Sequence, residues 1–151
     1  MAAESDDAGL ARSLVAEARS ASLGTLGGEG EPFVSYVITA ASANGSPLLL
    51  LSRLAWHSRN LERDTRASLL LVREADPESE TMSAIRLTLL GRVVRDTDPE
   101  SQRLFLARHL DATGYAGFAD FSFHRFDISA GHLVAGFGRI VSLSGEDLVE
   151  A

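Results

Sequence analysis

Apolar residues recur along this chain with two spacings, one typical of helices and the other of strands. Before residue 22 they return every three or four positions, and Asp6 and Asp7, which precede the repeat, can cap a helix. Further along, Asp98 followed by Pro99 has the residue types that commonly begin a helix. The predicted helices cover residues 8–21, 55–64 and about 97–110, and a short helical turn is predicted over 116–120.

The strand-like stretches are short and rich in β-branched, aromatic and leucine residues. Asn44 and Gly45 favour a tight hairpin turn between two of them, and Gly91 is placed where a bulge would interrupt another. The glycines of Gly136-Phe137-Gly138 interrupt the last stretch and permit a bulge or a close backbone approach. The predicted strands cover residues 22–27, 32–40, 47–52, 67–73, 85–95, 121–128 and 133–141.

This order of elements predicts a mainly β protein of the α+β class, an antiparallel barrel of six or seven strands with peripheral helices. A doubly wound parallel sheet is disfavoured because the early strands are joined by turns too short for crossover helices. The length of 151 residues fits a single domain over residues 1–151. Residues 1–8 and 144–151 are expected to be flexible ends.

Composition excludes several kinds of chemistry. There is no cysteine, and all 14 basic residues are arginine, so thiolate catalysis, Schiff-base lysines and P-loop lysines are impossible. The net charge of −7 argues against a nucleic-acid partner. No apolar run is long enough to span a membrane, and the acidic N-terminal residues are unlike a secretory signal, so a cytoplasmic location is expected.

The most informative segment runs from Leu51 to Leu61, where an apolar strand passes directly into a polar helix start. Ser52, Arg53, His57 and Ser58 bring hydroxyl, guanidinium and imidazole groups to that junction. Backbone N–H groups and the helix dipole at a helix N-terminus favour an anion such as phosphate. The alternative interpretation, which the segment alone leaves open, is a strand followed by a capped and solvated helix.

Other candidate residues are weaker. His109 ends a predicted helix, where a structural role is favoured, and His124 alternates within an aromatic strand and is expected to face solvent. Asp120 and Asp127 are interpreted as structural residues at the ends of that strand. No histidine spacing typical of a metal site and no Gly-x-Ser-x-Gly nucleophile motif is present, so neither a metal site nor a serine nucleophile is expected.

The order of several segments resembles a known family, the FMN-binding split β-barrel proteins related to pyridoxamine 5'-phosphate oxidase. The resemblance is strongest to its haem-utilisation branch. It covers about residues 10–141, and no single motif in it is specific. The segments that carry it are Gly30–Val37, Leu51–Leu61, Asp64–Leu71, Arg86–Arg92, Asp120 and Phe121 with Arg125, and Gly136–Arg139.

The resemblance implies a homodimer that binds FMN in a cleft between subunits. Contacts from the first long strand would fall on Ser35, Tyr36, Val37 and Ile38, and the phosphate and ribityl contacts on Leu51, Ser52, His57 and Ser58, with Arg53 and Asn60 nearby. Arg86 or Leu87 would lie near the flavin ring. Haem is the alternative cofactor that the haem-utilisation branch suggests.

The function that the resemblance implies is an FMN-dependent oxidoreductase acting on a small-molecule substrate that the sequence does not identify. Oxidase members carry arginine and lysine where this chain has Ser35 and Ala40, and an arginine-lysine pair where it has His57 and Ser58. A phosphate would therefore be held by fewer fixed charges. Two alternatives stay open, a non-catalytic flavin- or haem-binding carrier or sensor, and a dimeric interaction domain without a cofactor.

Overall fold

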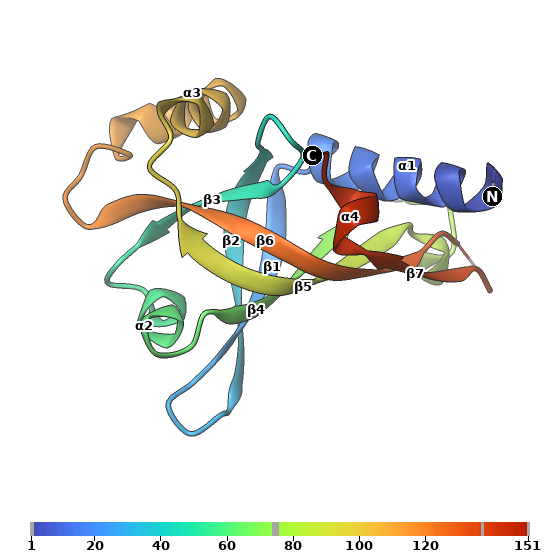
Figure 1. Cartoon of the computed structure of the whole chain (residues 1–151), viewed down its shortest axis with the longest axis horizontal. Coiled ribbons are helices and arrows are strands. Elements are labelled where there is room, and N and C mark those ends of the chain that lie inside the picture. The colour runs from blue at the N-terminus through green and yellow to red at the C-terminus, as the bar shows by residue number, and fades with distance from the viewer. Residues whose placement is uncertain (1, 74–75, 137, 151) are drawn as a thin grey trace.

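The computed structural model describes residues 2–73, 76–136 and 138–150 and contains a closed antiparallel barrel (Figure 1). Six strands follow the order β3-β2-β1-β4-β5-β6, the β3–β6 pairing closes the barrel, and β7 extends the sheet beyond β6. The strands are β1 (Ser20–Leu26), β2 (Pro32–Ala41), β3 (Pro47–Ser52), β4 (Arg66–Val72), β5 (Arg86–Arg95), β6 (Phe121–Val134) and β7 (Ile140–Ser144). The helices are α1 (Ala2–Glu17), α2 (Trp56–Arg63), α3 (Pro99–Arg108) and α4 (Gly145–Leu148), with short 3₁₀ turns at Thr81–Ser83 and Leu110–Gly114. The prediction of a mainly β antiparallel barrel with peripheral helices is confirmed.

The main core fills the barrel and is built mostly from leucine. Alternate residues of each strand point inward, so the inward set of the barrel strands forms one apolar interior. Helix α1 packs Ala11 and Leu14 onto this interior, and α4 adds Leu148. The fully buried strand leucines of this core are Leu23, Leu49, Leu69, Leu71, Leu87, Leu89 and Leu133, with Leu51 almost as deeply buried.

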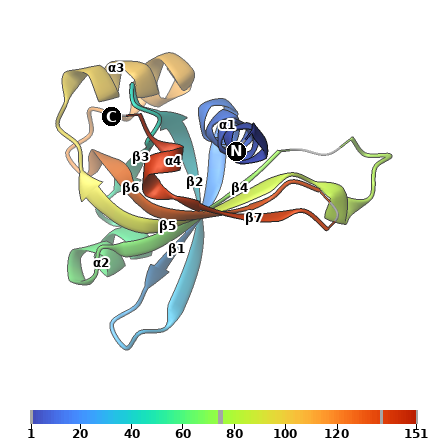
Figure 2. The same ribbon diagram turned by 45° about the vertical axis from the view of Figure 1, so that its right-hand side comes forward.

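Helix α3 covers a second core outside the barrel. Phe105 of α3 is fully buried against Phe123 of β6, with ring centroids 5.5 Å apart in an edge-to-face arrangement. The helix begins where the sequence predicts, because the Asp98 side chain accepts a hydrogen bond from the Glu100 N–H at 3.0 Å and Pro99 lies in the first turn. Figure 2 shows α1, α3 and α4 on the same side of the barrel and α2 away from them.

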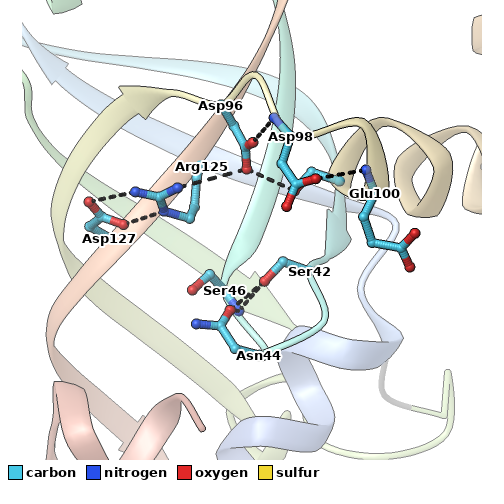
Figure 3. A network of polar contacts seen from close by, with 9 residues as sticks. Ser42, Asn44, Ser46, Asp96, Asp98, Glu100, Arg125 and Asp127 are labelled. Carbon is cyan, nitrogen blue, oxygen red and sulfur yellow. Dashed lines mark hydrogen bonds and ion pairs between the residues drawn. The ribbon is translucent and has the colours of Figure 1, made fainter. Parts of the chain in front are cut away.

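An ion-pair network fixes the start of α3 to strand β6 (Figure 3). Arg125 donates to Asp127 at 2.6 Å and lies 3.9 Å from the buried carboxylate of Asp96. Asp96 in turn accepts a hydrogen bond from the Ser101 hydroxyl at 2.9 Å. The guanidinium of Arg125 therefore compensates the buried charge of Asp96. Arg125 is one of the residues that carry the family resemblance, and in the protomer its role is structural.

Several predicted boundaries are wrong. Helix α1 begins at Ala2, six residues earlier than predicted, and ends at Glu17, so residues 2–8 are helical. The helical turn lies at Leu110–Gly114 and not at 116–120. The 144–151 segment, expected to be flexible, contains α4, whose first turn is closed by a capping box between Ser144 and Asp147.

The single strand predicted over 133–141 is also wrong. Strand β6 continues to Val134, and a turn then reverses the chain into β7. Gly136 and Gly138 have φ values of +119° and +78°, which other residues rarely adopt, so the two glycines belong to a hairpin turn and not to a strand interior. Phe137 lies outside the described residues. The other two glycine predictions are confirmed, since Gly45 turns with φ +92° and the β5–β6 register shifts at Leu90 and Gly91.

Candidate functional site

A cavity of about 470 Å³ lies at the end of the barrel beside α2. Its position follows from strand pairing, because Ser52 at the end of β3 pairs with Phe121 and Arg95 at the end of β5 pairs with His124. Three strand ends and the start of α2 therefore meet at one corner. Its lining is polar at Arg53, Ser58, Thr65, Arg95, Ser122 and His124, acidic at Glu62 and Asp120, and apolar at residues that include Leu61, Val93 and Phe121.

The predicted strand-to-helix junction forms one wall of this cavity. The Ser58 hydroxyl donates to the Ser52 carbonyl oxygen at 2.6 Å, which closes the junction on itself. Arg53 is exposed and lines the cavity together with Ser58. The first residue of α2 has no side-chain cap, since Ala55 occupies the N-cap position. The Ser58 N–H bonds to the Ala55 carbonyl oxygen at 3.1 Å, and among the described residues no side chain caps the helix amide groups that precede it, as expected for an anion site.

Ser52 is already bound to a carboxylate. Its hydroxyl donates to the Asp120 carboxylate at 2.9 Å and accepts the Leu54 N–H at 3.2 Å. The Arg53 N–H donates to the Asp120 carbonyl oxygen at 2.6 Å, so the Asp120 backbone is fixed against the junction as well. Asp120 is therefore part of the cavity wall and not only the end of a strand.

His57 lies in the first turn of α2 and contacts strand β2. Its Nδ1 atom lies 3.0 Å from the hydroxyl oxygen of Ser35, which shares the inward face of β2 with Val37. The Nε2 atom is buried and has no hydrogen-bond partner among the described residues. Burial lowers the pKa of His57 below its ordinary value of 6.5, and the nearby His124 lowers it further.

His124 faces the cavity, contrary to the expectation that it faces solvent. It shares the inward face of β6 with the fully buried Phe126, and its Nδ1 atom lies 3.2 Å from the Ser122 carbonyl oxygen. Because a carbonyl can only accept, Nδ1 carries the proton and Nε2 has a free lone pair when the ring is neutral. Burial lowers the pKa of His124, the Ser122 contact opposes that effect, and the charge of Arg95 adds to it.

Some residues of the predicted cofactor site have other surroundings in the protomer. Asn60 is buried and bonds through its amide nitrogen to Thr25 at 3.0 Å, while its oxygen accepts from Arg63 at 3.2 Å. Val37 and Leu51 are buried in the core, so only their backbone atoms could reach a ligand. These three side chains therefore contribute to packing.

Three further predicted residues lie away from the cavity. Tyr36 points to the outer face of β2 and is 77% exposed, and Ile38 packs beside the α3 core. Arg86 begins β5 and bonds to the carbonyl oxygens of Met82 and Ala84, both at 3.0 Å. It is nine residues from Arg95, roughly 30 Å along an extended strand, so one protomer does not bring it to this cavity.

The residue pattern did not predict Arg95, Thr65 or Ser122 as site residues, or that His124 faces the cavity. A signal was present for two of them, since Ser122, His124 and Phe126 alternate and Phe126 is an obvious core residue. Arg95 and Thr65 carry no such signal, because only the pairing of β4, β5 and β6 brings them to the junction.

The outer face of β2, β1, β4 and β5 is apolar and exposed. Cross-strand pairing aligns Tyr36 with Leu70 across Ser22, and Val34 with Leu90 across Gly24 and Ser68. Val34 is 69% exposed and Leu90 52% exposed. The small residues Ser22, Gly24 and Ser68 lie between these large apolar ones, and a face with several exposed apolar side chains is typical of an interface.

A second polar cavity, of about 490 Å³, lies beside α3 and the turn at Asn44 (Figure 3). Its carboxylates are engaged with the chain itself, since Asp96 and Asp127 contact Arg125 and Asp98 caps α3. Within the residues that the structure describes, no group of three histidine or acidic side chains is placed to hold a metal ion. No described helix is long and apolar enough to cross a membrane. The cavity beside α2 is therefore the better candidate site.

The chain matches the protein family described as CREG, beta-barrel, over residues 2–149. Among curated proteins, the chain is 36% identical over 121 residues to the chloroplastic non-canonical haem oxygenase HOZ of Arabidopsis thaliana. That match covers 78% of this chain but only 36% of the plant protein. It is 28% identical to the haem oxygenase HutZ of Vibrio cholerae, covering 89% of this chain and 79% of HutZ.

Solved structures extend the likeness to the fold. A haem-binding protein from Mycobacterium smegmatis superimposes with a TM-score of 0.87 at 32% identity, covering 94% of this chain and 59% of that one. A protein of the pyridoxinephosphate oxidase family from Clostridium acetobutylicum has a TM-score of 0.69 at 13% identity, covering 93% of this chain and 95% of the other. The second likeness shows the fold alone.

Proposed function

This chain belongs to the CREG-type β-barrel family, and from that premise we propose that it binds haem in the cavity beside α2. The observation that carries the proposal is the composition of the lining, in which Arg53 and Arg95 accompany a single imidazole, that of His124. The likeness to HOZ, to HutZ and to the mycobacterial haem-binding protein supports the same choice of ligand.

The residues present fit the chemistry of haem. Haem has two carboxylates, for which guanidinium groups are suitable partners, and an apolar ring, which Val93 and Phe121 can contact. Haem iron is commonly held by a histidine nitrogen, and His124 keeps Nε2 free when Nδ1 donates to Ser122. Bound iron would supply the oxygen or electron-transfer chemistry, and the chain would supply binding and orientation.

A homodimer is part of the proposal. The apolar outer face of β2, β1, β4 and β5 includes Tyr36, which the family resemblance places near the cofactor, yet in one protomer it points away from the cavity. A second copy packed on this face would bury Tyr36 and Leu70. It would also explain why one protomer alone does not gather all the predicted site residues.

FMN is the second candidate ligand, with oxidoreductase activity on a small molecule as the corresponding function. It is favoured by the uncapped start of α2, where backbone amides, Arg53 and Ser58 meet, because such a junction suits a phosphate. The flavin ring of FMN would then supply the redox chemistry. No residue identifies the substrate.

A ligand titration tests the proposal. Purified protein is titrated with hemin, followed at the Soret band, and in parallel with FMN, followed by flavin fluorescence. We expect a saturable hemin signal that Arg53→Ala with Arg95→Ala weakens at least tenfold, about 1.4 kcal/mol, for loss of the charge-assisted contacts. FMN binding in place of hemin would support the second candidate, and binding of neither would favour a dimeric interaction domain without a cofactor.

A further inference from the structure

We infer that Asp120 is a specificity-determining residue of the cavity beside α2, where its carboxylate takes the position of a bound phosphate and disfavours phosphate-bearing ligands. The inference rests on the proposed function only in that it assigns the cofactor to this cavity. It adds a reason for the choice between the two candidate ligands. The reason is that the acidic side chain of Asp120 repels a phosphate.

The first observation is that the Ser52 hydroxyl of the junction is already engaged within the chain. The Ser52 hydroxyl has one proton, and it is donated to the Asp120 carboxylate at 2.9 Å. The same oxygen accepts the Leu54 N–H, at 3.2 Å. A phosphate oxygen that needs the Ser52 proton must therefore displace Asp120.

The second observation is that Asp120 is held in place by its backbone. Its carbonyl oxygen accepts the Arg53 N–H at 2.6 Å, and the next residue, Phe121, pairs with Ser52 across β3 and β6. Displacement of the carboxylate would thus break a contact without freeing the segment. Asp120 belongs to the rigid frame of the junction.

The third observation concerns charge. No cationic side chain lies within 4.0 Å of the Asp120 carboxylate in the part of the chain that the structure describes. Arg53 and Arg95 line the same cavity, so Asp120 and Glu62 offset the attraction that the two arginines exert on an anion. A phosphate monoester carries up to two negative charges on one group, whereas the two negative charges of haem lie on two separate carboxylates. Repulsion by Asp120 therefore weakens binding of the phosphate more than binding of haem.

The test compares FMN with riboflavin, which has the same ring and lacks the phosphate. Asp120→Asn keeps the shape and one acceptor oxygen for Ser52, removes the charge, and replaces the other carboxylate oxygen by an amide NH2 group. We expect this variant to bind FMN at least about tenfold more tightly than the wild type, with riboflavin affinity changed less than about twofold. Asp127→Asn, which lies on β6 and outside this cavity, is the control for removal of a carboxylate charge and should change neither affinity.

Equal changes in FMN and riboflavin affinity, or an unchanged FMN affinity in the variant, would overturn the inference, and so would an absence of FMN binding in both proteins. The hemin titration is read separately. If hemin does not bind but Asp120→Asn gains FMN affinity, the haem proposal fails and the role of Asp120 stands. If hemin binds and the FMN-to-riboflavin ratio is unchanged, the role of Asp120 fails alone. Circular dichroism checks folding, and Asp120→Ser replaces the asparagine variant if that one does not fold.

Discussion

The Nδ1 atom of His57 on α2 lies 3.0 Å from the hydroxyl oxygen of Ser35 on β2, which joins the helix to the inner face of the barrel. On the other side of the ring, Nε2 is buried without a partner among the described residues. A protonated ring would bury an N–H without an acceptor there, so the site favours neutral imidazole. Burial of the ring lowers the pKa of His57, which agrees with a neutral imidazole at this position.

The two half-buried histidines predict a loss of stability in mild acid. Burial lowers the pKa of both His57 and His124 below the ordinary value of 6.5, so the unfolded chain binds more protons than the folded chain in that range. Stability from this source is complete above about pH 6.5. It falls as the pH drops through 6.5 toward the lowered pKa values, and the loss ends below them. Urea unfolding between pH 7.5 and 5 measures it.

Variants in which glutamine, a side chain that does not titrate, replaces the histidines isolate this effect. His57→Gln combined with His124→Gln removes both titrating groups and should flatten the pH dependence over that interval, even if stability at pH 7.5 is lower. His132→Gln, whose side chain lies outside the cavity, should leave the slope as in the wild type. A double variant as acid-sensitive as the wild type would contradict the assignment.

The role of His124 toward iron can be separated from binding of the ring. Hemin and iron-free protoporphyrin IX share the ring and both carboxylates, so the ratio of their affinities reports the contribution of the metal ligand. We expect His124→Ala to weaken hemin binding about tenfold or more and to leave protoporphyrin binding within about twofold. Displacement of the Soret maximum in the variant is an independent measure. Equal losses for both ligands would indicate a role in packing alone.

The apolar outer face predicts the oligomeric state. Leu70→Glu places a charge within the proposed interface, across Ser22 from Tyr36, and should convert the proposed dimer into a monomer in sedimentation experiments. Leu110→Glu is a matched control, because Leu110 is 73% exposed but lies on the turn after α3 and not on this face. A wild-type protein that sediments as a monomer, or a Leu70→Glu protein that remains dimeric, would contradict the prediction.

Most of the fold could be predicted from the sequence because its signals are local. The hairpin turn at Gly45, the cap of α3 by Asp98 and the bulge at Gly91 each depend on a few adjacent residues. The break between β6 and β7 was missed because two glycines within an apolar run fit a bulged strand and a turn equally well. The antiparallel pairing of Val134 with Ile140 decides for the turn.

The candidate site was less predictable, for reasons of geometry. The junction at Ser52 and Ser58 could be found because strand and helix are consecutive in the chain. Arg95 and Asp120 reach it only through strand pairing between β3, β5 and β6, which no local pattern encodes. Asn60 has the composition of a ligand contact, yet the Thr25 hydroxyl opposite its amide gives it a structural role.

Two glycine substitutions, one in the barrel and one in α1, are expected to change the free energy of unfolding in opposite directions. A Cβ atom at Gly91 would lie 2.0 Å from the Asp127 carbonyl oxygen, so backbone must move, and Gly91→Ala should destabilise the protein by about 1–3 kcal/mol. Gly9 lies within α1 with nothing within 4 Å of an added Cβ, so Gly9→Ala should stabilise it by about 0.5–1 kcal/mol through helix propensity. Urea unfolding of the two variants beside the wild type measures both effects. If the two substitutions change the free energy of unfolding in the same direction, either the bulge at Gly91 or the helix through Gly9 is wrongly placed.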